Sequence, residues 1–288
     1  MVQPNPTKEE ALQVSRRLIS LLLREQFSVV VLEEFRKVLS ERLTPRELEQ
    51  VRFLEEPDIY PACDFIMVVG GDGTILHMAK VATRHRIPIL GVNIGTMGFI
   101  AELESSELQE LARLAIGDYT IDSRLMLDVI VKRDEEIIFH DIALNDAVIT
   151  KGAVARIVHL NVHCDNMQAM EFGGDGIVIS TPTGSTGYSL SAGGPIMEPD
   201  ARSFLITPIC AHDVVSRCMI TSDKRTITVQ LSHNARRNAF LSVDGGRAFK
   251  LNMGDVVSVS CSRLETKLIR LKNSSFYDVV NHKFKRYE

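Results

Sequence analysis

Several features of membrane, secreted and metal-centred proteins are scarce or missing in this sequence. No apolar run approaches the roughly 20 residues that a bilayer-spanning helix needs, and the N-terminal residues 1–6 lack the charged and apolar regions of a signal peptide. The five cysteines are scattered without a C-x-x-C pair, and the eight histidines form no H-E-x-x-H motif. We therefore expect a cytoplasmic protein with reduced cysteines and no dedicated metal site, so that any metal arrives with phosphate.

The sequence also lacks an excess of positive charge. Its 33 Lys and Arg residues stand against 37 Asp and Glu residues, a formal net charge of −4. This balance provides no basic field for nucleic acid or an anionic membrane, so small molecules are the expected partners. Hydrophobic residues make up 45% of the chain, as in ordinary folded proteins, and its 288 residues suffice for two domains.

The two parts of the chain have different hydrophobic patterns. Residues 1–120 alternate helices, predicted over 7–24, 44–53 and 105–116, with strands, predicted over 27–32, 65–70 and 87–93. This order predicts an α/β domain with a parallel sheet. Residues 121–271 predict an all-β, sandwich-like domain, with strands over 125–131, 136–140, 147–150, 156–164, 177–180, 226–231, 240–243 and 253–271. Residues 272–288 form a tail that could return to the first domain.

The most informative stretch is an apolar strand that runs into Gly70, Gly71, Asp72, Gly73 and Thr74. Apolar residues recur at helical spacing after it, so the N–H groups of a helix start would face the turn and favour a phosphate. Thr74 can cap that helix. A carboxylate among phosphate-binding amides needs a metal or a proton, so Asp72 is the candidate catalytic residue. A plain strand-turn-helix connection is the structural alternative.

A second glycine-bearing loop, residues 95–99, follows the next predicted strand. Ligands of parallel sheets bind beyond the carboxyl ends of the strands. The loops 70–74 and 95–99 could therefore face the same crevice.

A dense run of hydroxyls and glycines occupies residues 173–195 in the β part. Its hydroxyls and amides suit ribose, phosphate and base edges, Gly187 allows close approach of the backbone, and the Tyr188 ring offers a face for stacking on a heterocycle. Loops of this composition are often only mobile surface segments. Here Asp175 and Pro182 favour a binding role.

Together, these strings resemble the NAD kinase family, in its compact prokaryotic type, over nearly the whole chain. The most specific parts are residues 70–74, Asn145-Asp146 and residues 175–188. Lipid kinases of the diacylglycerol type share the first string, and phosphofructokinases share it loosely. The last string separates the NAD kinases from both.

The resemblance implies phosphorylation of the 2′-hydroxyl of the adenosine ribose of NAD, giving NADP, with ATP as donor and Mg²⁺ or another divalent cation. Asp72 would accept the proton, with Gly73 beside the acceptor ribose. The ATP phosphates would lie on Gly70, Gly71, Gly73 and Thr74. Asn145 would read the adenine and Asp146, where many members carry Glu, would hold ribose hydroxyls.

The same resemblance assigns the adenosine pocket and a shared carboxylate. The segment that encloses the adenosine contains Thr186, Gly187, Tyr188, Ser189, Leu190 and Ser191, and many members have Ala at the position of Gly187. Asp175 matches a carboxylate that approaches the second half of the dinucleotide, sometimes across a subunit boundary. The family is commonly homodimeric or homotetrameric, so self-association is expected.

Three further NAD-binding candidates have structural alternatives. His77 lies one turn into the predicted helix, within reach of a ligand, although a single helical histidine is more often an ordinary surface residue. Arg156 could neutralise the pyrophosphate or be a solvated strand end. Asp244 stands in an Asp-Gly-Gly hairpin turn, and the family places an acidic residue like it near the nucleotide.

Two other functions remain open on the sequence. A lipid kinase would need an apolar entry surface beside the glycine-rich loop, and no amphipathic stretch indicates one. A non-catalytic NAD(P) sensor would have no use for Asp72. The motifs leave open the choice of NAD or NADH, of ATP or polyphosphate, the regulators and the exact oligomeric state.

Overall fold

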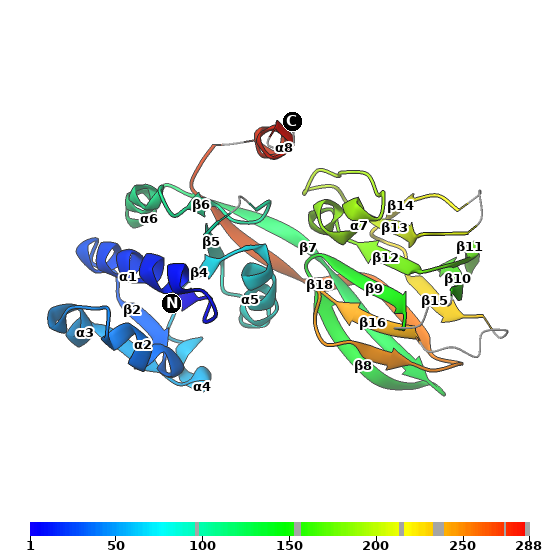
Figure 1. Ribbon diagram of the computed structural model, residues 1–288, viewed down its shortest axis with the longest axis horizontal. Helices are drawn as coiled ribbons and strands as arrows, with labels where there is room; N and C mark the ends of the chain where they lie inside the picture. Colours follow the sequence, from blue (N-terminus) through cyan, green and yellow to red (C-terminus); the bar gives the residue numbers. More distant parts are fainter. Residues whose placement is uncertain (96–97, 153–156, 213–215, 233–238, 274, 286–288) are drawn as a thin grey trace. The chain divides into compact units, whose positions relative to one another are not determined.

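The computed structural model describes residues 1–95, 98–152, 157–212, 216–232, 239–273 and 275–285. The chain divides into two compact units: unit 1 comprises Met1–Ser123 and Thr266–Glu288, and unit 2 comprises Arg124–Glu265. Two long strands, β7 (Thr120–Arg133) and β18 (Val256–Arg270), each begin in one unit and end in the other (Figure 1). No helix in the described ranges is both long and apolar enough to cross a bilayer.

Unit 1 is built around a parallel sheet. β4 (Ile66–Gly70) pairs in parallel with β1 (Val2–Pro4) and with β5 (Ile89–Asn93). β5 also pairs with β6 (Leu103–Glu104) and with the end of β18. Every residue of β4 and β5 is buried, as expected of parallel strands covered on both faces. This part confirms the predicted α/β class.

Helices cover the two faces of this sheet (Figure 1). Met67 and Val69 of β4 share a hydrophobic cluster with α1 (Glu9–Arg24), and the alternate residues of β4 face the other side, where α5 (Asp72–His85) packs. The periphery consists of a parallel pair and short helices: β2 (Val29–Leu32), η1 (Glu33–Phe35), α2 (Arg36–Ser40), α3 (Pro45–Gln50), β3 (Val51–Leu54), α4 (Glu56–Ile59), η2 (Leu108–Glu110) and α6 (Leu111–Ala115).

Two of the predicted helices are too long. The helix predicted over 44–53 ends at Gln50 because residues 51–54 alternate between buried and less buried side chains and pair with β2 as a strand. Its start is well specified, since Thr44 and Glu47 form a capping box before Pro45. The helix predicted over 105–116 is reduced to η2 and α6, and Gly117, with φ of +74°, follows directly.

Unit 2 is all β, with two sheets around one core. One sheet has the order β14-β13-β12-β9-β16-β17, with antiparallel neighbours. The other contains the antiparallel strands β11, β10, β15 and the first part of β18, together with the β7–β8 hairpin. One hydrophobic cluster draws residues from both sheets, among them Ile149, Ile179 and Leu241 from the first and Leu160, Val229 and Val257 from the second. This is the predicted sandwich-like arrangement.

The strand bounds in unit 2 are β8 (Glu136–Ala143), β9 (Asp146–Lys151), β10 (Val158–Cys164), β11 (Met167–Gly174), β12 (Gly176–Ser180), β13 (Ser203–Ile209), β14 (Met219–Ser222), β15 (Ile227–Leu231), β16 (Ala239–Val243) and β17 (Phe249–Leu251). Strands β11, β13 and β14 were not predicted from the sequence. β11 and β14 each lie at the end of a sheet order and are largely exposed, so they lack a clear apolar alternation. The tail forms α8 (Phe276–Phe284), which belongs to unit 1.

Candidate functional site

The glycine-rich turn of unit 1 lies between a buried strand and a helix start. β4 ends at Gly70, and α5 begins at Asp72 with Gly71 as its N-cap. A Cβ at Gly70 would lie 2.4 Å from Thr74 Oγ1, whereas a Cβ at Gly71 or Gly73 would meet nothing within 4 Å. Gly70 is thus needed for packing, and the other two leave the backbone at the helix N-terminus open. Such a helix start suits an anion.

Thr74 does not cap the helix, so that prediction was wrong. A capping side chain must come from the residue that precedes the first helical position, and Thr74 is the third residue of α5. Its Oγ1 instead accepts a hydrogen bond of 2.8 Å from Asn5 Nδ2. The backbone N–H of Asn5, just after β1, donates to the carbonyl of Val69 at 2.8 Å. Asn5 therefore ties the end of β1 to the turn.

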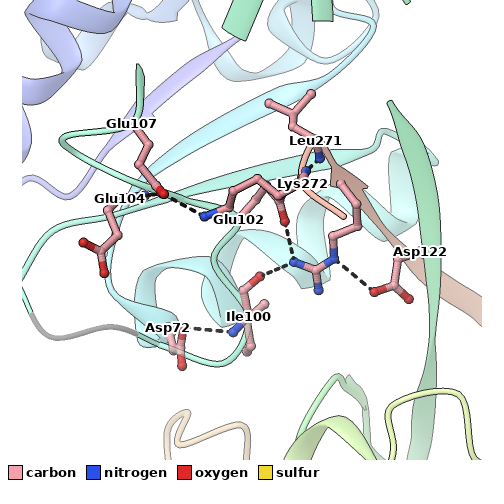
Figure 2. Close-up of polar contacts among 9 residues, drawn as sticks. Asp72, Ile100, Glu102, Glu104, Glu107, Asp122, Leu271 and Lys272 are labelled. Atoms are coloured by element: carbon pink, nitrogen blue, oxygen red, sulfur yellow. Dashed lines mark hydrogen bonds and ion pairs between the residues drawn. The ribbon is translucent and has the colours of Figure 1, made fainter. Parts of the chain in front are cut away.

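The carboxylate of Asp72 is held by the backbone of the second glycine-bearing loop. Its Oδ2 accepts from the N–H of Phe99 at 2.9 Å. Its Oδ1 accepts from the N–H of Ile100 at 3.4 Å (Figure 2). A Cβ at Gly98 would lie 1.9 Å from Asp72 Oδ1, so this position has room only for glycine. The two loops expected to share a crevice do come together, and Asp72 joins them.

A lysine from the C-terminal helix completes this cluster. Nζ of Lys283 lies 3.9 Å from the centre of the Phe99 ring, within the range of a cation–π contact. Burial lowers the pKa of Lys283, and the negative charge of Asp72 acts in the opposite direction. The tail therefore brings a cation to the loop that holds Asp72.

Two further NAD-binding candidates, His77 and Arg156, differ in whether the structure describes them. His77 lies in the second turn of α5 with an exposed side chain, one helical turn after Gly73 on the same face of the helix. It faces the region of the open glycines, and its contact with a ligand stays a prediction. Arg156 lies outside the described residues.

In unit 2, Asp244 organises the segment that precedes β9. Its carboxylate accepts three hydrogen bonds, from the N–H groups of Leu144 at 2.8 Å, Asn145 at 2.8 Å and Asp146 at 3.0 Å. The N–H of Asp244 donates to the carbonyl of Asp146 at 2.9 Å. Asp244 and Gly245 have φ of +51° and +67°, and they are the central residues of a turn that the Gly246 N–H closes by donating to the Val243 carbonyl at 3.0 Å, between the antiparallel strands β16 and β17. The hairpin alternative is confirmed, and the same aspartate clamps the Asn145 backbone.

The side chains of Asn145 and Asp146 lie beside Gly187. A Cβ there would be 3.3 Å from Asn145 Nδ2 and 3.9 Å from Asp146 Oδ2, and a Cβ at Gly184 would be 2.2 Å from the Asn145 carbonyl oxygen. Oδ1 of Asn145 is buried and has no hydrogen-bond partner among the described residues. Since a buried polar atom without a partner is costly, this oxygen is available for a ligand.

The hydroxyl-rich segment is ordered rather than a free surface loop. It forms η3 (Thr183–Thr186) and α7 (Tyr188–Ser191). The hydroxyl of Ser185 accepts from the N–H of Met197 at 3.0 Å, and that of Ser189 pairs with Thr207 at 2.8 Å. Both serines are fully buried, so these hydroxyls hold the segment together.

The remaining members of this segment lie at its surface. Tyr188 and Ser191 are exposed, and Thr186, Gly187 and Leu190 are partly exposed. The expected adenosine contacts of this group and of Ser189 stay predictions. A ligand would meet the rim of the segment, with the buried serines beneath it.

Asp175 lies apart from the Asn145 group. It precedes β12, whose far end pairs with Asp146, and five residues of extended chain span roughly 17 Å. Its Oδ1 forms an ion pair of 2.6 Å with Nζ of Lys151. A single chain therefore does not bring Asp175 to Asn145.

Several contacts of the site were missed from the sequence. Asn5 carries no local signal, because its contact with Thr74 depends on the pairing of β1 with β4. Phe99 and Ile100 contribute backbone groups, which no side-chain pattern reveals. Lys283 lies 211 positions after Asp72 and reaches the loop only through the fold. Among the described residues, no group of three or more His, Cys, Asp or Glu side chains is placed to hold a metal ion.

Both parts of the chain are similar to known proteins. The family described as ATP-NAD kinase N-terminal domain matches residues 1–119, and ATP-NAD kinase C-terminal domain matches residues 144–271. An NAD kinase of Acetivibrio thermocellus is 36% identical over 281 residues, covering 97% of this chain and 94% of that protein. One of Thermoanaerobacter sp. is 38% identical over 284 residues, covering 98% and 97%.

Solved structures show the same fold. Yeast NADH kinase complexed with NADH matches with a TM-score of 0.88 at 24% identity, covering 97% of this chain and 85% of that one. An NAD kinase from Archaeoglobus fulgidus in complex with ATP matches with a TM-score of 0.66 at 24% identity, covering 89% and 97%. With two family domains matched over most of its length and relatives above 30% identity, the chain belongs to the NAD kinase family and is a phosphotransferase.

Proposed function

We propose that this chain transfers the γ-phosphoryl group of ATP to the 2′-hydroxyl of the adenosine ribose of NAD, giving NADP, with Asp72 as the proton acceptor. The observation that carries the proposal is the position of Asp72. Its carboxylate is the first side chain of α5, beside the open backbone of Gly71 and Gly73, and is oriented by two N–H groups of another loop. The comparisons do not favour a lipid kinase or a sensor without activity.

The chemistry explains why a carboxylate is needed at this point. In the transfer, the 2′-oxygen forms a bond to the γ-phosphorus, the bond from that phosphorus to the β–γ bridging oxygen breaks, and ADP leaves. The alcohol proton passes to Asp72. A general base contributes about 10²–10⁴-fold to such a step, and alignment and charge neutralisation supply most of the rest. The amides of the turn and the start of α5 suit the phosphates.

Mg²⁺ would come with the ATP phosphates. Mg²⁺ is commonly bound by one or two carboxylates together with substrate phosphates rather than by a protein cage. Asp72 is the carboxylate at the helix start, and a place as such a ligand is the alternative to its role as proton acceptor. When bound, the ion neutralises phosphate charge.

We assign the adenosine of NAD to unit 2. The buried Oδ1 of Asn145 suits the exocyclic amine of adenine, and the neighbouring carboxylate of Asp146 suits ribose hydroxyls. The exposed ring of Tyr188 provides a stacking surface. Thr186, Gly187, Leu190 and Ser191 would enclose the remaining faces.

We also propose a cytoplasmic homodimer or homotetramer in which Asp175 serves the NAD site of a neighbouring copy. The support is that Asp175 and Asn145 of one chain lie at opposite ends of β12. A second copy of the chain could bring its own Asp175 to the NAD site. Size-exclusion chromatography with light scattering would report the mass. A fully active monomer would contradict this arrangement.

The function is tested by supplying purified protein with NAD, ATP and Mg²⁺ and identifying the product by mass spectrometry. We expect NADP that an NADP-specific dehydrogenase accepts. Phosphorylation of a lipid acceptor without NADP formation would indicate a lipid kinase, and NAD binding without any product would indicate a sensor. Repeating the assay with NADH and with polyphosphate would define the acceptor and donor ranges.

A further inference from the structure

Both the N–H and the carbonyl group of Ile100 form hydrogen bonds to charged side chains. Its N–H donates to Asp72, and its carbonyl oxygen accepts from a guanidinium N–H of Arg270 at 3.2 Å (Figure 2). Arg270 is the last residue of β18 and belongs to unit 1. The residue whose N–H donates to the carboxylate is therefore also held, through its carbonyl, by an arginine distant in sequence.

Arg270 is itself fixed by two carboxylates. The same nitrogen, Nη1, also donates to Glu102 Oε2 at 3.3 Å, and Nε donates to Asp122 Oδ2 at 3.1 Å. The side chain of Arg270 is 18% exposed and that of Glu102 only 5%. A planar guanidinium presents several donors in fixed directions, which a lysine ammonium cannot reproduce.

Glu102 anchors the end of this chain of contacts. Its Oε1 accepts from the N–H groups of Leu271 at 2.8 Å and Lys272 at 2.7 Å (Figure 2). Its own N–H donates to the carbonyl of Gly91 in β5 at 2.9 Å. Both oxygens of this buried carboxylate are used, so the arginine has little freedom to move.

We propose that Arg270 is a positioning residue for the phosphoryl transfer, acting through Ile100 on the carboxylate of Asp72. Glu102 and Asp122 hold the guanidinium, the guanidinium holds the Ile100 carbonyl, and the fixed Ile100 N–H sets the direction of Asp72. The inference rests on the proposed role of Asp72 as proton acceptor. Arg270 touches neither substrate, so its removal is expected to change the rate rather than substrate binding.

The test compares Arg270→Met and Arg270→Lys in the full chain. We expect Arg270→Met to lower kcat by about 10- to 100-fold, the range for a catalytic group displaced by about 1 Å, with KM for NAD and ATP changed by no more than about twofold. Arg270→Lys should restore part of kcat because it keeps the charge without the fork. If Arg270→Met fails to fold, Glu102→Gln replaces it in the test. This variant retains an oxygen for the two amides, and it should also lower kcat.

A matched control is Arg133→Met in unit 2, where Arg133 pairs with Asp255 at 2.7 Å and the Asp255 side chain is 1% exposed. This variant also removes an arginine from a pair with a buried carboxylate, and it should leave kcat unchanged. A loss of kcat equal to that of Arg270→Met would show only general destabilisation and would overturn the proposal.

The decisive step repeats Arg270→Met in an Asp72→Asn background. If Arg270 acts through Asp72, its effect on kcat should largely disappear there, which is the non-additivity of coupled residues. An undiminished loss in that background, or a rise in KM alone, would overturn the inference while leaving the role of Asp72 intact. Unchanged turnover in Asp72→Asn alone would instead refute the proposed role of Asp72, and the inference with it.

Discussion

The two candidate site regions both contain hydrogen bonds from backbone N–H groups to an aspartate carboxylate, but these bonds serve different purposes. In unit 1, backbone N–H groups of Phe99 and Ile100 hold the carboxylate of Asp72, which in our proposal acts on the substrate. In unit 2, the carboxylate of Asp244 holds the backbone N–H groups of residues 144–146, and in our proposal the side chains of Asn145 and Asp146 bind the ligand. The proposal thus makes Asp72 the catalytic group and Asp244 a structural support.

The comparison shows that the residue type in a motif does not reveal its role. Both aspartates lie next to glycines and both accept several N–H donors. They differ in where the donors lie. The donors to Asp72 lie in the loop after β5, and the donors to Asp244 lie at the start of β9. Substitutions in unit 1 should therefore lower the rate of the reaction, whereas substitutions in unit 2 should lower stability or the affinity for NAD.

The largest effect is expected from Asp244→Ala. Three backbone N–H groups would lose a charged acceptor, which should lower the free energy of unfolding by about 2–5 kcal/mol. Urea denaturation followed by circular dichroism would measure the change, with Asp244→Asn as an intermediate that keeps one acceptor oxygen. A wild-type unfolding curve for Asp244→Ala would show that Asp244 does not support the fold, and the proposed difference between Asp72 and Asp244 would be wrong.

A large effect on rate is expected from Gly98→Ala. The new Cβ would meet Asp72 Oδ1 at 1.9 Å and force the carboxylate away from the Phe99 and Ile100 amides. We expect kcat to fall roughly 10²-fold, the cost of misplacing a catalytic group, while KM for NAD changes little. Steady-state kinetics would check this split. Full activity in a folded variant would mean that the observed orientation of Asp72 is unimportant.

A smaller effect on binding is expected from Asn145→Ala and Tyr188→Ala. Each should weaken the interaction with NAD by about 1–3 kcal/mol, as a lost buried hydrogen bond or stacking surface does. Because these groups would touch adenosine in ground and transition states alike, KM should rise more than kcat falls. Unchanged KM for NAD in both variants would place the adenosine elsewhere.

The smallest effect is expected from Gly187→Ala, the counterpart in unit 2 of Gly98→Ala. Its Cβ would lie 3.3 Å from both Asn145 Nδ2 and the Gly184 carbonyl oxygen, contacts that shifts of only a few tenths of an ångström would relieve. We expect KM for NAD to change by about threefold or less, which is within about 0.7 kcal/mol. A rate loss as large as that of Gly98→Ala would show that the two loops are not as different as proposed.

Local patterns predicted much of the fold. The fully apolar run before Gly70, the 3.6-residue spacing of α1 and the alternation of β15 depend only on neighbouring residues, and all three elements are present. The helix predicted through Phe53 failed because pairing with β2 overrode the local pattern, and the exposed strand β11 gave no apolar alternation to recognise.

The candidate site was predictable in its motifs but not in its geometry. Asp72 could be chosen because a strand, a glycine-rich turn and a helix surround it, whereas Asn145 and the nucleotide role of Asp244 followed from the resemblance to NAD kinases. The division of labour between them depends on long-range contacts, such as that of Arg270 with Ile100, 170 residues away in sequence. Ser189 was predicted to bind NAD, and its buried hydroxyl instead pairs with Thr207, because a hydroxyl-rich sequence does not show which hydroxyls point inward.

The central claim is that Asp72 is the working carboxylate, and Asp72→Asn tests it most directly. This variant keeps the shape and one acceptor oxygen but cannot take up the proton. The measurement pairs kcat at saturating NAD, ATP and Mg²⁺ with the dissociation constant for NAD from calorimetry. We predict a fall in kcat of about 10²–10⁴-fold with NAD affinity within about twofold. Recovery of part of the rate by excess Mg²⁺ would assign Asp72 to the metal instead, and near-wild-type kcat would contradict the account.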